Sequence, residues 1–282
     1  MRRREVLKGV TAAALTAVIA RARAFAQDPI EMKPAMPSPA SKPNQQIVML
    51  VYPRFTALDL VGPHTFLAGL MDADVHLVWK SKSAIPTDRG SLTIVPSTTF
   101  EESPSDPDVL FVPGGMEGTT AVMQDDEALA FLSERGKRAR YVTSVCTGSM
   151  VLGAAGLLNG YRATSHWAAR DLLPLFGAIP EAGRVVIDRD RITGGGVTSG
   201  IDFGLVLAAQ MSGQQYAEML QLLNEYDPHP PFDTGTPVKA GPKMTGELTQ
   251  LLDPGLAAMR KAALVASNRS NMRRKQTSKG DT

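Results

Sequence analysis

A short β-prone segment that ends at the chain's only cysteine constrains the fold more than any other feature. The run Tyr141–Ser144 leads through Val145, Cys146 and Thr147 to Gly148 and a stretch rich in alanine, leucine and glycine. This order predicts a sharp strand-to-helix turn with the cysteine at its tip. A side chain there lies at the carboxyl edge of a sheet, where the start of the following helix favours a thiolate. The alternative interpretation is a small buried structural cysteine.

Strand-like and helix-like segments alternate through the central part of the chain. Strands are predicted at 47–52, 75–79, 91–96, 109–112, 140–144, 185–188 and 191–193, and helices at 58–70, 126–138, 147–158 and 198–211. Continuous apolar strands alternating with helices indicate a three-layer α/β fold with a mainly parallel sheet. In such sheets ligands bind at the carboxyl ends of the strands. After Gly213 the alternation stops, and further helices are predicted at 214–226 and 245–268.

The N-terminus predicts export. Within residues 1–26, the pair Arg3 and Arg4 precedes an apolar stretch, 10–20, and a small-x-small site that ends at Ala26. The apolar stretch is shorter than the roughly 20 residues that span a bilayer. These features resemble a twin-arginine signal peptide and predict a periplasmic protein without stable membrane association after cleavage. An uncleaved anchor or a basic amphipathic helix is the alternative.

Net charge and cysteine count limit the function classes. Residues 1–26 carry +5 and residues 269–282 carry +4 of a formal net charge of +2, which leaves −7 on residues 27–268. An acidic body argues against a nucleic-acid partner. A single cysteine excludes an internal disulfide, so the fold rests on its hydrophobic core. The predicted domain plan after the signal is a proline-rich linker at 27–45, an α/β domain at 46–213, a helical extension at 214–268 and a basic disordered tail at 269–282.

Asp59 is the acid best placed to act with the thiol. It lies at the start of the helix that follows the first predicted strand, at the same sheet edge as Cys146. A partly buried carboxyl beside a thiol has a raised pKa and can pass a proton to and from a substrate. An ordinary helix N-cap is the alternative role for this aspartate.

Backbone amides and one histidine complete the candidate site. Gly114 and Gly115 follow a buried strand, and their N–H groups together with that of Thr147 could form an oxyanion-binding cradle. The alternative is an ordinary turn that ends the strand. His166 either approaches the thiol or caps the helix that starts at Ala168. The four histidines are scattered without metal-ligand spacing, so no metal site is predicted.

Five motifs in this order resemble the DJ-1/PfpI superfamily, the class I glutamine-amidotransferase-like fold. They lie within Ile47–Gly213 and are Leu58–Pro63, Val112–Gly115, Ser144–Gly148, Ala163–Trp167 and Thr193–Asp202. The Cys-Thr-Gly sequence with an early Asp-x-x-Gly-Pro is most similar to the isonitrile hydratase branch. The stretch Glu225–Phe232 also looks like that branch. PfpI-type peptidases carry histidine at the position of Thr147, which argues against peptidase activity.

The resemblance implies a flavodoxin-like sheet, a homodimer, a small-molecule substrate and no cofactor. It places the nucleophile at Cys146 and the acid at Asp59, with supporting groups at Thr147 and Gly115. For an isonitrile, the implied reaction passes through a thioimidate to an N-substituted formamide.

Two other functions stay open at this point. The same motifs occur in ligand-sensing domains of AraC-type regulators, so a non-catalytic small-ligand sensor is the first alternative. A glyoxalase- or deglycase-like stress protein is the second. That branch favours glutamate as the acid, where this chain has Asp59.

The export signal is testable. Replacing Arg3 and Arg4 together by lysine is expected to leave the protein in the cytoplasm, because the twin-arginine pathway reads that pair. Cell fractionation and immunoblotting measure the distribution. Arg21→Lys with Arg23→Lys is the matched control and should export normally. Unchanged location of the Arg3/Arg4 variant would show that the twin-arginine interpretation is wrong.

Overall fold

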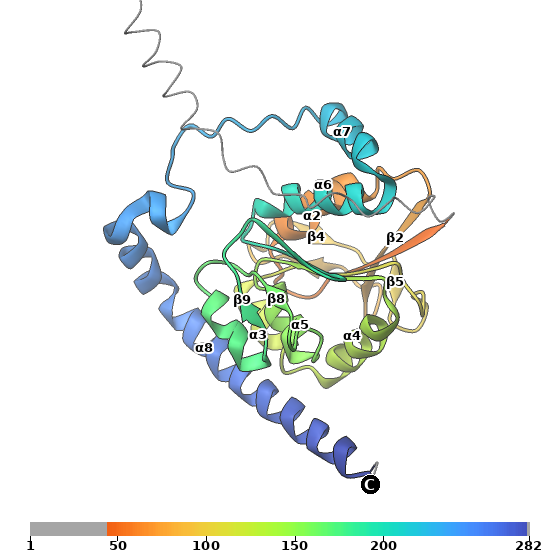
Figure 1. The fold of residues 1–282 in the computed structure, drawn as a ribbon, viewed down its shortest axis with the longest axis vertical. Helices are drawn as coiled ribbons and strands as arrows, with labels where there is room; N and C mark the ends of the chain where they lie inside the picture. The colour runs from red at the N-terminus through yellow and green to blue at the C-terminus, as the bar shows by residue number, and fades with distance from the viewer. Residues whose placement is uncertain (1–43, 281–282) are drawn as a thin grey trace, which may run out of the picture. The chain divides into compact units, whose positions relative to one another are not determined.

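A seven-stranded sheet is the middle layer of residues 44–280, the part of the chain that the computed structural model describes, with side chains described as far as residue 269 (Figure 1). The strand order is β10-β11-β7-β6-β1-β2-β5, and only the β10–β11 pair is antiparallel. The strands are β1 (Gln45–Leu50), β2 (Ala73–Trp79), β5 (Thr98–Thr99), β6 (Val109–Val112), β7 (Tyr141–Val145), β10 (Val185–Asp188) and β11 (Arg191–Gly194). The mainly parallel sheet is confirmed.

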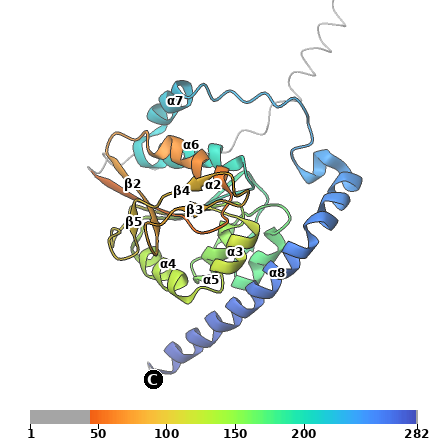
Figure 2. The same ribbon diagram turned by 180° about the vertical axis from the view of Figure 1, so that it is seen from behind.

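Helices cover both faces of this sheet (Figures 1 and 2). One face carries α2 (Ala57–Leu67), α6 (Ser199–Ser212) and α7 (Gln214–Leu223), which pack on one another in that order. The other face carries α3 (Met116–Val122), α4 (Asp126–Arg138), α5 (Gly148–Ala154) and the 3-10 helix η1 (Arg170–Phe176). Because helices cover both sides, β6 is apolar at every position and fully buried. The predicted three-layer α/β fold is confirmed.

Several short elements lie outside the sequence-based expectation. The strand predicted at 91–96 is present in part, as β4 (Thr93–Ile94), which pairs antiparallel with β3 (Ile85–Pro86). A further two-stranded sheet joins β8 (Arg162–Ala163) to β9 (Ile179–Pro180). The sequence does not predict β3, β5, β8, β9, α3 or η1, because these short elements carry neither a continuous buried apolar run nor a clear period.

A long helical segment, α8 (Pro237–Gly280), forms most of the C-terminal extension and is kinked at Gly241, whose φ of 77° and ψ of 168° are not helical. The sequence predicts a helix only over 245–268 with a break at Pro254, but α8 starts earlier and continues through that proline. It also runs to Gly280, where the sequence predicts a disordered tail. The helix packs on α3, α5 and η1 through small or flexible side chains. Four of them are buried: Met259, Ala262, Ala263 and Ala266.

The predicted signal peptide, and the linker as far as residue 43, fall outside the described residues. β1 starts at Gln45, one residue before the predicted start of the α/β domain. Between residues 44 and 280, no helix has both the length and the apolar character that crossing a bilayer requires.

Candidate active site

Cys146 stands at a strained turn between β7 and α5. Its φ of 58° lies in the left-handed region, which non-glycine residues rarely adopt. Its N–H group lies 3.0 Å from the carbonyl oxygen of Gly194 and 2.9 Å from that of Gly195, and donates to both. Such strain persists where the surrounding structure enforces it, and it gathers at functional sites. The predicted strand–turn–helix geometry is therefore present around this cysteine.

Asp59 lies in the first turn of α2 and is fully buried. Its Oδ2 accepts a hydrogen bond of 3.0 Å from the N–H group of Gly114, and the N-cap position of α2 belongs to Thr56. Its Oδ1 has no hydrogen-bond partner among the described residues. The carboxyl thus binds the loop after β6 instead of capping its own helix, and one oxygen stays available.

Gly114 lies between Asp59 and Cys146 and is in close contact with both. A Cβ atom at this position would lie 2.6 Å from the backbone nitrogen of Thr147, 2.7 Å from Asp59 Oδ2 and 2.8 Å from Cys146 Cβ. Contacts under 3.0 Å do not occur for real Cβ atoms. Only glycine therefore allows the three elements to meet, because its missing side chain leaves room for the carboxyl oxygen.

Burial controls the protonation of this pair. Burial raises the pKa of Asp59 to about 8, although hydrogen bonds from Cys146 and Gly114 act in the opposite direction. Burial and then the nearby Asp59 carboxylate raise the pKa of the Cys146 thiol well above its ordinary value, while the Thr147 amide lowers it. The sequence predicts a thiolate favoured by the start of the helix, whereas burial acts on the pKa of the Cys146 thiol in the opposite direction.

The two glycine amides of the predicted oxyanion cradle already have acceptors. Gly114 N–H donates to Asp59, and Gly115 N–H donates to Thr147 Oγ1 at 2.9 Å. The Thr147 amide acts on the Cys146 sulfur. These amides therefore orient the acid, the threonine and the thiol, because the turn after β6 folds back onto α2 and the elbow.

His166 takes up a structural position. Its Nδ1 accepts a hydrogen bond of 3.3 Å from the N–H group of Ala168, which lies in the turn before η1 and not at the start of a helix, because η1 begins at Arg170 with Ala169 as its N-cap. Its ring packs against Gly196 and beside Trp167. Burial lowers its pKa, so the imidazole is neutral at pH 7. The neighbouring Ser165 hydroxyl donates to the Cys146 carbonyl oxygen at 3.0 Å.

The sequence did not predict several other polar groups that lie around the turn at Cys146. Ser149 also donates to the Cys146 carbonyl, and Thr119 and Tyr52 extend a buried hydrogen-bonded chain from Thr147. The only signal for Tyr52 is a hydroxyl at the end of an apolar run. Thr119 lies on α3, which the sequence did not predict, so no pattern placed it at the site.

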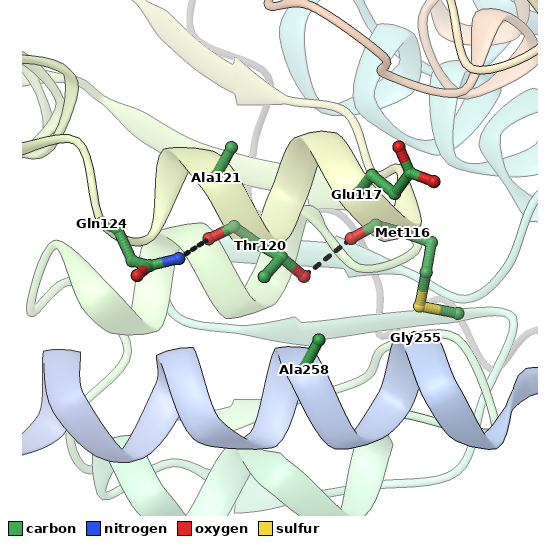
Figure 3. Close-up of a pocket in the computed structure, with 7 residues that line it drawn as sticks. All are labelled: Met116, Glu117, Thr120, Ala121, Gln124, Gly255 and Ala258. Atoms are coloured by element: carbon green, nitrogen blue, oxygen red, sulfur yellow. Dashed lines mark hydrogen bonds between the residues drawn. The ribbon is translucent and has the colours of Figure 1, made fainter.

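A cavity of about 230 Å³ lies between α3 and α8, on the outer side of α3 (Figure 3). It is lined by Met116, Glu117, Thr120, Ala121, Gln124, Gly255 and Ala258. None of these side chains belongs to the Cys146 site, where the cysteine itself is only 5% exposed. Among the residues whose side chains are described, no group of three or more histidine, cysteine, aspartate or glutamate side chains could hold a metal ion.

A parallel sheet carrying a cysteine at a strained elbow, with a buried carboxyl beside it, defines a class of α/β proteins with a nucleophile elbow. A sequence model of the DJ-1/PfpI family matches residues 45–210, and the chain belongs to that family. It is 47% identical to an isonitrile hydratase from Pseudomonas putida over 228 residues, which are 81% of this chain and 99% of the relative.

Solved structures agree with this assignment. A ThiJ/PfpI family protein from Pseudomonas syringae shares 49% identity and superposes with a TM-score of 0.77, covering 83% of this chain and 96% of the other. Oxidized DJ-1 from Toxoplasma gondii shares 20% identity with a TM-score of 0.58, covering 65% and 100% of the two chains. The second likeness concerns the fold alone.

The raised pKa of Asp59 predicts a pH-dependent stability. Between about pH 4 and pH 8 the folded state holds the Asp59 proton more tightly than the unfolded state, so this group's contribution to stability falls as pH rises. Asp59→Asn removes that dependence and keeps an acceptor for Gly114. The variant should gain stability over the wild type as pH rises, by up to about 4 kcal/mol near pH 7.

Thermal unfolding measured from pH 5 to pH 9 tests this expectation. Asp106→Asn, on an exposed loop before β6, is the matched control and should show no such trend. A difference between Asp59→Asn and wild type that stays constant or shrinks with rising pH would contradict the buried acid.

Proposed function

We propose that this chain is a cofactor-free hydro-lyase that converts an isonitrile and water into an N-substituted formamide, with Cys146 as nucleophile and Asp59 as proton carrier. The observation that carries the proposal is the buried Asp59 carboxyl, held by Gly114 beside a lone thiol. The 47% identity to an isonitrile hydratase over most of both chains supports the choice of substrate.

The first half of the reaction is addition of the thiol across the terminal carbon of the isonitrile. The sulfur forms a bond to that carbon while the thiol proton passes to the Asp59 carboxylate, which then delivers it to the same carbon. The product is a thioimidate, R–N=CH–S, and no proton is gained or lost overall. The hydrogen bond between the thiol and the Asp59 carboxyl supports this transfer, and the Gly114 amide holds the carboxyl in place.

The second half is hydrolysis of the thioimidate. Asp59 takes a proton from water as the water oxygen bonds to carbon, and the proton goes to nitrogen. The C–S bond then breaks, the remaining hydroxyl proton returns to sulfur through Asp59, and R–NH–CHO leaves. A single carboxyl can serve both halves because its raised pKa lies near the working pH.

The proposal has three further parts. A small uncharged substrate fits a site whose thiol is nearly enclosed. The family resemblance supports a homodimer. The N-terminal sequence supports export to the periplasm through the twin-arginine pathway.

The activity is tested with cyclohexyl isocyanide and purified protein, by following formamide formation. Cys146→Ala should abolish turnover, because the covalent route is lost. Asp59→Asn should lower kcat by about 10²- to 10⁴-fold, the usual range for a general acid–base group. Asp106→Asn, at the opposite edge of the sheet, is the control and should retain full activity.

Each other outcome contradicts a defined part of the proposal. Turnover by Cys146→Ala would show that Cys146 is not the nucleophile. Ligand binding without turnover by wild type would indicate a sensor, and lactate formed from methylglyoxal would indicate a glyoxalase.

The pH profile tests the proton carrier separately. The reactive pair holds one proton, shared between Cys146 and Asp59, so the doubly protonated form present below the Asp59 pKa is inactive. The value of kcat/KM should therefore rise almost tenfold per pH unit below about 8 and level off above it. Steady-state kinetics from pH 6 to pH 9.5 give this profile. A profile that falls through pH 8 would assign the protonated carboxyl as the reactive form instead.

A further inference from the structure

A buried chain of hydrogen bonds leads away from Thr147. Its hydroxyl accepts the Gly115 N–H group at 2.9 Å and lies 2.9 Å from the hydroxyl of Thr119. Thr119 Oγ1 lies 3.1 Å from the phenol oxygen of Tyr52, which donates to the carbonyl oxygen of Pro113 at 2.7 Å. Thr119, Tyr52 and Thr147 are almost fully buried, so water does not compete for these protons.

Counting protons fixes the direction of every bond in this chain. The carbonyl of Pro113 only accepts, so the single phenol proton of Tyr52 lies on that bond. Thr119 must then supply the proton between itself and Tyr52, and Thr147 must supply the proton between itself and Thr119. Every short oxygen–oxygen contact then has one proton. Only the longer approach of Thr147 Oγ1 to the Gly115 carbonyl, at 3.4 Å, is left without one.

We propose that Tyr52 and Thr119 are positioning residues that hold the hydroxyl proton of Thr147 turned away from Cys146. The Thr147 hydroxyl lies within hydrogen-bonding reach of the sulfur and would lower the thiol pKa if it donated there. Its proton instead stays on the bond to Thr119, and the Thr147 backbone N–H group is the donor on the sulfur side. This rests on the proposed function and deepens it, because a sulfur without a hydroxyl donor depends on Asp59 to take up the thiol proton.

The titratable groups near Cys146 are consistent with this direction of the hydrogen bonds. The titratable groups that act electrostatically on Cys146 are Asp59, from α2, and Tyr52, from the end of β1. Burial raises the pKa of Tyr52 well above its ordinary value, so the phenol stays protonated and keeps its bond to Pro113. Chains of hydrogen bonds polarise one another in a buried environment, which favours one common direction.

Removing the phenol hydroxyl of Tyr52 should reverse the direction of donation along this chain of hydrogen bonds. In Tyr52→Phe, Thr119 no longer needs to donate toward residue 52 and can turn its proton to Thr147. Thr147 can then donate to the sulfur and stabilise the thiolate. The expected result is faster alkylation of Cys146 by iodoacetamide at pH 8, about tenfold for each unit by which the thiol pKa falls. Because the chain has one cysteine, the intact mass gives the modified fraction directly.

Three further variants keep this test decisive. Thr119→Val also removes the acceptor of the Thr147 proton and should accelerate alkylation in the same way. Thr119→Ser keeps the hydroxyl and should alkylate at the wild-type rate. Tyr52→Phe combined with Thr147→Val should alkylate no faster than Thr147→Val alone, because no hydroxyl is left to turn. Each variant is first checked for cooperative thermal unfolding.

Two results would overturn the assignment. An unchanged or slower alkylation rate in both Tyr52→Phe and Thr119→Val would show that the Thr147 proton is not held away from the sulfur. Equal acceleration with and without the Thr147 hydroxyl would show that the change acts only by loosening the packing. The measurement uses no isonitrile, so it is independent of whether the proposed hydratase activity is found.

Discussion

The burial of one carboxyl group beside one thiol governs the chemistry available to this protein. In water the aspartate would be ionised and unable to donate a proton at neutral pH. Burial moves its pKa to about 8 and raises that of Cys146 as well, so near that pH the carboxyl can take up the thiol proton and give it back. A site of this kind suits an uncharged, compact electrophile whose reaction needs a proton to be taken and returned at the same place.

The parallel sheet creates this arrangement. β1, β6 and β7 are neighbours and run in the same direction, so their carboxyl ends meet at one edge. The chain leaving β1 supplies Tyr52 and then, in the first turn of α2, Asp59. The turns after β6 and β7 supply Gly114 and Cys146. The absence of a side chain at Gly114 lets the acid and the elbow touch, and any larger residue would push them apart.

Much of this could be predicted from local patterns. The buried strands, the elbow at Cys146 and the position of Asp59 at the same sheet edge all follow from short apolar runs, turn residues and the rule for parallel sheets. α3 could not be predicted, because seven residues after a Pro-Gly-Gly turn carry too weak a period. Its Thr119, and with it the chain of hydroxyls to Tyr52, stayed hidden for that reason.

The order of the residues thus settles which chemical groups exist and at which edge of the sheet they collect, since strand direction and turn chemistry are local properties. It leaves open which of these groups form hydrogen bonds with one another. The Gly114 and Gly115 amides turn out to hold Asp59 and Thr147, and burial raises the pKa of the thiol. Those outcomes depend on the exact distances between segments far apart in the chain and on how completely they exclude water, which are set only when the layers pack.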